Sequence, residues 1–284
     1  MSFRSKILGR LTLATLLVGI ALATWAFWLE PASFRIHEET LSITDWPTSC
    51  ENRRIAVLAD LHVGSPYKGL GSLERLVDAV NEAAPDLVLL PGDFVIQGVV
   101  GGRFVPPEDA AAVLARLKAP MGVFAVLGNH DWWLDPARVA TALSHNNIPV
   151  LDDRSELVGT GNCRIRLVGI SDFWEGPHDV AKALRDVTPG EFVLAFTHNP
   201  DIFPELPSQV TLTIAGHTHG GQVHLPLLGR PIVPSAYGER YAIGHVIENG
   251  RHLYVSSGVG TSILPVRFRV PPEATMLRLT RSSN

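Results

Sequence analysis

Five short polar motifs in this sequence combine carboxylate, imidazole and amide side chains, which are groups that bind metals or transfer protons. In chain order they are Asp60-Leu61-His62, Gly92-Asp93, Gly128-Asn129-His130-Asp131, Thr197-His198-Asn199-Pro200 and Gly216-His217-Thr218-His219-Gly220-Gly221-Gln222. The motifs contain no cysteine, which excludes a thiolate zinc site. Their mixed nitrogen and oxygen donors favour Mn, Fe or Zn over Mg or Ca.

Each motif follows directly on a short apolar run that predicts a β-strand. The runs are 54–59, 86–90, 122–127, 192–196 and 210–215. Ligands of open α/β sheets gather at the carboxyl ends of the strands, so these motifs can converge on one site. In an extended segment the Asp-x-His and His-x-His spacings also place both side chains of a pair on the same side. We therefore expect one metal-dependent site at the carboxyl edge of a sheet.

The order and form of these motifs resemble the calcineurin-like metallophosphoesterase superfamily, whose pattern is D-x-H, GD, GNH[DE], H and GH-x-H. The match spans roughly residues 55–279 and is most similar to the small, membrane-anchored bacterial phosphodiesterases of the YkuE and YaeI type. The segments Gly258-Val-Gly260, Pro265-Val-Arg267-Phe268 and Pro271-Pro272-Glu273 also resemble that group. The resemblance implies an α/β fold, a four-layer α/β/β/α sandwich with a two-metal site at one end.

The same resemblance implies two divalent metal ions as cofactors. The first would be held by Asp60, His62, Asp93 and His219, and the second by Asp93, Asn129, His198 and His217, so that Asp93 bridges the pair. Two such cations bind a phosphoryl oxygen and lower the pKa of a bridging water. The expected nucleophile is the metal-bridging hydroxide, which attacks phosphorus in line without a covalent enzyme intermediate.

Two residues beside the expected ligand Asn129 are predicted to act in catalysis. His130 is the candidate general acid, which protonates the leaving-group oxygen. Asp131 has two interpretations, because it could orient or charge the imidazole of His130 or could cap the helix that follows. The candidate substrate contacts are Trp132, Leu227 and Arg267. Aromatic side chains near the site belong either to the core or to a contact with an acyl chain or a sugar.

The predicted activity is hydrolysis of a phosphodiester or of a lipid-linked phosphate. Purple acid phosphatases carry a Tyr ligand three residues after the GD aspartate, where this chain has Ile96. Protein Ser/Thr phosphatases have Asp-Arg-Gly shortly after it, whereas residues 94–98 contain no Arg. The alternative is a lipid-linked or nucleotide-sugar pyrophosphatase, such as a UDP-2,3-diacylglucosamine hydrolase. A non-enzyme alternative is a metal-binding, envelope-associated protein on the same fold.

Composition limits the domain number and the partners. The chain has 284 residues, of which 46% are apolar and 18% charged, so it can bury a substantial core. Its net charge of −4 disfavours a nucleic acid partner, since such proteins are usually basic. We predict a linker and an approach strand in residues 31–50 and one catalytic domain in residues 51–284. The sequence does not indicate an oligomeric state.

Helical spacing alternates with the first three expected strands. Helices are predicted over 71–83, 107–117 and 136–143, and this alternation favours a parallel sheet covered by helices. Further strands are predicted over 164–170, 192–196, 210–215, 252–256 and 276–279. We expect these later strands to form a second, mixed sheet.

Residues 1–30 are predicted to be a membrane anchor or a signal segment. Three basic residues precede an uncharged run over 11–29, which approaches the length needed to span a bilayer. A cleavable signal peptide ending near Ala21-Leu22-Ala23 and a buried core helix are the alternatives. The basic flank should stay cytoplasmic. This predicts attachment to a bacterial inner membrane, with the catalytic domain facing the periplasm or the outside.

The two cysteines, Cys50 and Cys163, each precede a strand-like run. An oxidising compartment permits a disulfide between them. Two unpaired thiols are the alternative, because the sequence does not show how close the residues lie.

Overall fold

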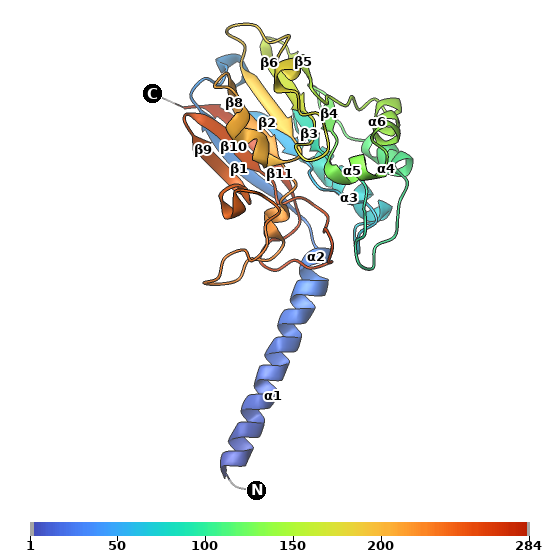
Figure 1. Ribbon diagram of the computed structural model, residues 1–284, viewed down its shortest axis with the longest axis vertical. Helices are drawn as coiled ribbons and strands as arrows, with labels where there is room; N and C mark the ends of the chain where they lie inside the picture. Colours follow the sequence, from blue (N-terminus) through green and yellow to red (C-terminus); the bar gives the residue numbers. More distant parts are fainter. Residues whose placement is uncertain (1–2, 283–284) are drawn as a thin grey trace.

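Apolar segments of the chain form two β-sheets that pack face to face, in a computed structural model that describes residues 3–282 (Figure 1). The strands of the first sheet, in spatial order, are β1 (Arg35–Ile43), β11 (Glu273–Arg281), β2 (Arg53–Val57), β3 (Leu87–Pro91) and β4 (Val123–Val126). Those of the second are β5 (Arg154–Thr160), β6 (Cys163–Ile170), β7 (Val193–Thr197), β8 (Val210–Ala215), β10 (Arg251–Val255) and β9 (Gly244–Glu248).

The first sheet combines a parallel half with an antiparallel junction. Strands β2, β3 and β4 are parallel, as their alternation with helices predicts. The assignment of 276–279 to the second sheet is wrong, because β11 lies antiparallel to β2 and parallel to β1. Both sheets face the same core, so an apolar pattern does not distinguish between them. The edge strands β5 and β9 were not predicted, because their exposed residues interrupt the apolar pattern.

Alternating side chains of the central strands build two cores. In β2, Ile55 and Val57 face the second sheet, whereas Ala56 packs with the helices α3 (Leu70–Glu82), α4 (Pro107–Leu114) and α6 (Pro136–His145). The outer face of the second sheet is covered by α7 (Val180–Ala183), η3 (Pro200–Glu205) and η5 (Gly238–Tyr241). The four layers confirm the predicted α/β/β/α sandwich. Three short helices lie outside these layers, namely η2 (Thr48–Cys50), α5 (Asn129–Leu134) and η4 (His219–Gly221).

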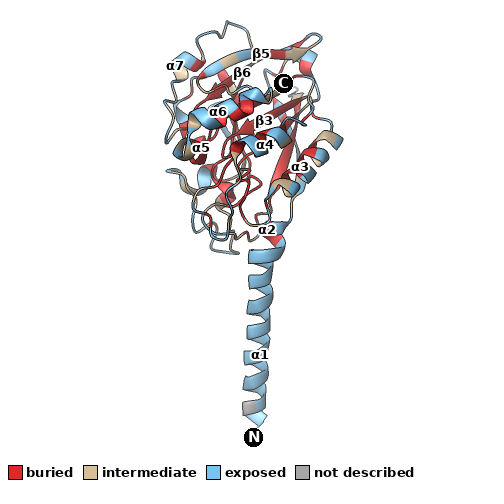
Figure 2. Cartoon of the chain, turned by 90° about the vertical axis from the view of Figure 1, so that its right-hand side faces the viewer, coloured by how far each residue is buried: buried red, intermediate tan, exposed pale blue. Residues whose placement is uncertain are grey.

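A long helix projects from one end of the sandwich. It comprises α1 (Phe3–Thr24), a π-helix (Trp25–Leu29) and α2 (Glu30–Ala32). The segment Lys6–Ala32 is long and apolar enough to cross a membrane, by length and composition. The side chains of α1 that the structure describes are exposed (Figure 2), which contradicts the buried core-helix alternative. A membrane anchor and a signal segment fit these properties equally.

A disulfide joins the two cysteines. Cys50 in η2 bonds to Cys163 in β6, both lie in the core between the sheets, and 113 positions separate them in the sequence. Closing a loop of this length removes conformational freedom from the unfolded chain. We expect the Cys50→Ala/Cys163→Ala variant to lose about 4–5 kcal/mol of unfolding free energy. Chemical denaturation of the full chain in detergent measures this loss, with reductant-treated wild type as the control. Equal midpoints for oxidised wild type and variant would contradict it.

Candidate metal centre

The predicted ligands lie where strands β2, β3, β4, β7 and β8 end, and all seven side chains are buried. Five of them have a positive φ: Asp60 (52°), His62 (39°), Asp93 (58°), His217 (69°) and His219 (50°). Such a conformation costs a non-glycine residue about 1–3 kcal/mol and persists only where the surroundings impose it. The backbone therefore turns sharply at the sheet edge and directs these side chains inward.

Four ligand atoms form a first group, because one donor atom from each of Asp60, His62, Asp93 and His219 lies within 4.8 Å of the others. The Nε2 atoms of His62 and His219 are 3.1 Å apart. Asp93 Oδ2 lies 3.4 Å from His62 Nε2, and Asp60 Oδ1 lies 3.7 Å from His219 Nε2. The structure thus brings together the ligand set predicted for the first ion.

A second group adjoins the first. His198 Nε2 lies 3.1 Å from Asn129 Oδ1 and 3.1 Å from His217 Nδ1, and the latter two atoms are also 3.1 Å apart. Asp93 Oδ2 is 3.3 Å from His198 Nε2. One oxygen of Asp93 therefore lies between the two groups, which is the place required of a bridging ligand.

The hydrogen bonds of two histidines show that this donor set fits metal ions. His62 Nδ1 lies 3.2 Å from the Val95 carbonyl oxygen, and His198 Nδ1 lies 2.8 Å from that of Pro91. A carbonyl only accepts, so each Nδ1 carries a hydrogen, and each ring in its neutral form presents the Nε2 lone pair to the centre. His198 Nε2 then faces the oxygens of Asn129 and Asp93, which are also acceptors. A divalent cation satisfies such a set of converging lone pairs.

Burial favours the neutral form of three ligands, whereas a fourth, His198, is held in its charged form. It raises the pKa of Asp60 to about 7 and lowers the pKa of His62 to about 3. Burial also lowers the pKa of His219 well below its usual value. For His198 burial opposes protonation, but the charge of Asp93 raises its pKa to about 10. Asp60 and His198 therefore hold protons that a bound metal must displace, whereas His62 and His219 are already neutral, so metal affinity falls as pH falls.

Two motif glycines provide the space that the ligands occupy. A Cβ on Gly128 would clash with Asp93 Oδ1 and would lie 2.8 Å from His198 Nδ1. A Cβ on Gly216 would lie 2.6 Å from Asp60 Oδ2. Any larger residue at these positions would displace a ligand.

Asp131 joins the two central turns of the site. Its carboxylate accepts hydrogen bonds from the backbone N–H groups of Asp93 (2.9 Å), Phe94 (3.0 Å), Val95 (3.3 Å) and Gly128 (2.9 Å). The bond from Gly128 caps α5, a helix that begins at Asn129 and was not predicted. Asp131 thus caps the helix that contains it, not the helix that follows, α6, whose N-cap is Asp135. We infer that Asp131 positions the bridging ligand.

His130 lies beside the ligand groups. Its backbone N–H donates to Asp93 Oδ1 (2.9 Å), and its ring centroid is 4.7 Å from that of His62 and 4.8 Å from that of Trp133. The side chain is buried and its Nδ1 has no partner among residues 3–282. Burial lowers the pKa of His130. The geometry leaves this imidazole available for proton transfer.

The three predicted substrate contacts lie in different environments. Trp132 is half-buried and packs against the core beneath the helices. Leu227 is fully exposed on its loop. Arg267 is fully buried, where its guanidinium donates to the carbonyl oxygens of Ser257 (2.9 Å) and Gly260 (2.6 Å). Arg267 therefore supports the loop behind the ligands, and the three residues do not converge on one surface.

Two other tryptophans border the centre. The rings of Trp174 and His217 have centroids 4.3 Å apart, and Trp133 packs on His130. Both indoles are about half exposed. Asp172 holds the first of them, because its carboxylate accepts the backbone N–H of Trp174 at 2.9 Å. Asp172 is not part of any of the five sequence motifs. It nevertheless follows the strand predicted over 164–170, so it obeys the strand-end rule, by which site residues lie at the carboxyl ends of strands.

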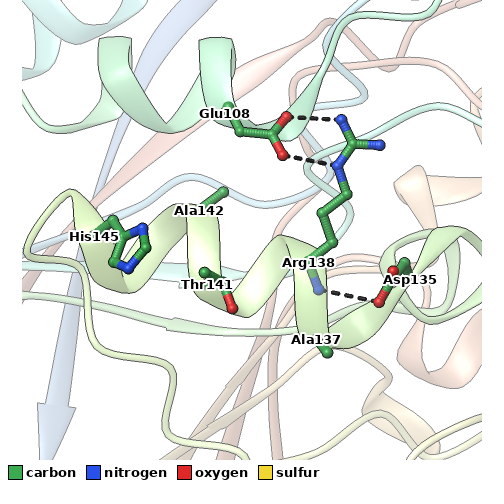
Figure 3. A pocket seen from close by; sticks show the side chains of 7 residues that line it. All are labelled: Glu108, Asp135, Ala137, Arg138, Thr141, Ala142 and His145. Carbon is green, nitrogen blue, oxygen red and sulfur yellow. Dashed lines mark hydrogen bonds and ion pairs between the residues drawn. The ribbon is translucent and has the colours of Figure 1, made fainter.

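A separate surface pocket lies on the helical layer (Figure 3). Its lining comes from Glu108 of α4 and from six residues between Asp135 and His145. Arg138 Nε donates to Glu108 Oε1 at 2.7 Å across it. None of these lining residues is a predicted site residue, so this pocket is not the metal centre.

Comparison with known proteins identifies the family. Residues 53–221 match the family described as calcineurin-like phosphoesterase, and this segment is more than half of the chain and contains all seven predicted ligands. The chain belongs to the calcineurin-like phosphoesterase family. Together with the buried Asp and His group, this membership makes it a metal-dependent phosphoester hydrolase.

Relatives of this calcineurin-like phosphoesterase cover nearly its whole length. Phosphodiesterase YaeI of Escherichia coli is 34% identical over 89% of this chain and 90% of its own. The metallophosphoesterase YkuE of Bacillus subtilis is 28% identical over 92% of this chain and 90% of its own. UDP-2,3-diacylglucosamine pyrophosphatase LpxG of Chlamydia trachomatis is 26% identical over 94% and 96%. The similarity to YaeI and YkuE agrees with the resemblance found in the motifs.

Proposed function

We propose that this enzyme is a two-metal-dependent phosphodiesterase. The observation that carries the proposal is the position of Asp93 Oδ2, which lies 3.4 Å from His62 Nε2 in one group and 3.3 Å from His198 Nε2 in the other. The first ion takes Asp60, His62, Asp93 and His219, and the second takes Asp93, Asn129, His198 and His217. The similarity to a named phosphodiesterase supports the choice of a diester as substrate.

The protein side chains have distinct tasks in this reaction. Two divalent cations, when bound, would stabilise the charge on the phosphoryl oxygens and would lower the pKa of a water molecule towards about 7. The carbonyls of Val95 and Pro91 fix the tautomers of His62 and His198, so that both rings present a lone pair. His130 holds the proton for the leaving-group oxygen. Burial lowers its pKa, and an anionic phosphoester beside the ring restores its protonated form.

A chromogenic phosphodiester assay tests this function. We expect the purified full chain in detergent to hydrolyse a bis(4-nitrophenyl) phosphodiester with added Mn²⁺, and to lose that activity with excess chelator. Readdition of Mn²⁺ should restore it. Absence of hydrolysis with Mn, Fe and Zn in turn would instead support the metal-binding, non-catalytic alternative.

We also propose that the N-terminal helix anchors the enzyme with its catalytic domain outside the cytoplasm. The basic residues Arg4, Lys6 and Arg10 precede the apolar run, and such residues stay on the cytoplasmic side. The disulfide between Cys50 and Cys163 supports the same orientation, because disulfides persist in oxidising compartments.

A reporter fused after the C-terminus tests the orientation. A phosphatase reporter that is active only after export should be active, and a reporter that is active only in the cytoplasm should be silent. The reverse pattern would contradict the orientation. It would favour the second candidate, a pyrophosphatase of UDP-linked lipids, which the similarity to LpxG suggests.

A further inference from the structure

The end of the N-terminal helix is fixed to the catalytic domain. The Glu30 carboxylate is buried and accepts hydrogen bonds from the backbone N–H groups of Arg269 (3.0 Å) and Val270 (2.6 Å). The backbone N–H of Arg267 donates to the carbonyl of Ala26 at 2.9 Å. These bonds set the direction in which α1 leaves the domain, so the same face of the domain always surrounds its exit.

Large apolar side chains are exposed on the loops around this exit. Figure 1 shows the orange loop after β8 and the teal loop after β3 extending beside α2, at the end of the domain from which α1 projects. We define the apolar collar as Val100, Phe104, Leu227, Leu228, Ile263 and Leu264. Leu227 and Ile263 also have φ values of 67° and 61°, where a glycine would cost less.

Hydrogen bonds join the loops of the apolar collar into one surface. The backbone N–H of Val100 donates to the carbonyl of Ile263 at 2.9 Å. The Gln222 side chain accepts from the backbone N–H of Ser262 (2.8 Å) and donates to its carbonyl (3.1 Å). Scattered exposed apolar residues need no explanation, but a connected group of them indicates a partner.

We propose that the apolar collar rests in the interfacial layer of the phospholipid bilayer that α1 crosses. The inference depends on the membrane anchor proposed above, because α1 leaves the domain at the same end as these loops (Figure 1). Trp25 and Trp28 are exposed at the same end of the helix, and tryptophan favours the interface between lipid and water. A bilayer covers the whole surface at once, and the anchor holds it there.

The metal centre is connected to this surface. The loop with Val100 and Phe104 follows the bridging ligand Asp93, and the loop with Leu227 and Leu228 follows the ligand His219. The backbone N–H of Gly260, just before Ile263, donates to the carbonyl of Asp60 at 2.6 Å. The loops that hold the ligands thus extend to the lipid.

Two cations accompany the apolar side chains. Arg103 and Arg269 are exposed on the collar loops, where their guanidinium groups can bind a headgroup phosphate of the bilayer.

Fluorescent labels in the membrane test the position of the apolar collar directly. Both native cysteines are in the disulfide, so a single introduced cysteine can carry an environment-sensitive label. The test variant is Leu228→Cys in the full chain. Leu157→Cys is the matched control, because Leu157 is exposed on β5, at the opposite end of the sandwich from α1 (Figure 1). Leu17→Cys, within α1, reports on the anchor itself.

Each labelled chain is placed in lipid nanodiscs at one chain per disc, so that a second copy cannot cover the collar. We expect blue-shifted emission and quenching by doxyl lipids at positions 228 and 17, and quenching by aqueous iodide at 157. Iodide quenching at 228 with lipid quenching at 17 would overturn the inference and leave the anchor intact. Iodide quenching at both positions would overturn the anchor and this inference together.

Discussion

Replacing Asp93 with alanine is expected to remove both metal ions and to reduce hydrolysis to near background. Asp93 Oδ2 lies 3.4 Å from His62 Nε2 and 3.3 Å from His198 Nε2, so the two groups share this one oxygen. The other oxygen, Oδ1, accepts the backbone N–H of His130 at 2.9 Å. The substitution therefore removes the shared ligand and loosens the residue assigned as the acid.

Metal analysis and activity must be measured on the same preparation. Asp78→Ala is a suitable control, because Asp78 is an exposed acidic residue of α3 that pairs with Arg116 on the surface. The control should keep both ions and its activity, since exposed ion pairs contribute little to stability. Two bound ions per chain in Asp93→Ala would show that Asp93 is not the bridging ligand.

The seven predicted ligands could be found from the sequence because site residues of α/β sheets follow the carboxyl ends of strands. Asp60, His217 and their partner ligands follow runs whose apolar character identifies buried strands, and parallel strands bring their carboxyl ends to one edge. Asp172 obeys the same rule but stands outside any recognisable motif. Asp172 holds Trp174 beside His217. This contact exists only in the folded chain, so the sequence alone does not indicate the role of Asp172.

Long-range pairing explains what the sequence left open. β11 carries an apolar pattern that fits either sheet, and only its register with β2 and β1 decides the outcome. The bond between Cys50 and Cys163 depends in the same way on two elements 113 positions apart. The sequence predicts Arg267 as a candidate substrate contact, yet the carbonyls of residues 257–260 surround its guanidinium in the interior.

His130→Ala should separate the general acid from the ligands. His130 follows the ligand Asn129, but its Nδ1 has no partner among the described residues and its ring packs edge-on against His62. We expect the variant to keep both metals and to hydrolyse alkyl phosphodiesters 10²–10⁴-fold more slowly, as is typical for loss of a general acid. The loss should be smaller for a nitrophenyl ester, because nitrophenolate leaves without a proton.

His217→Ala provides the matched comparison, because this histidine belongs to the second ligand group. Its Nδ1 lies 3.1 Å from both Asn129 Oδ1 and His198 Nε2, so its removal should weaken metal binding and slow both ester types alike. The decisive experiment assays both variants on alkyl and nitrophenyl diesters and measures metal content on the same samples. An equal loss on both esters together with missing metal in His130→Ala would make His130 a ligand. The leaving-group oxygen would then have to take its proton from a group other than His130.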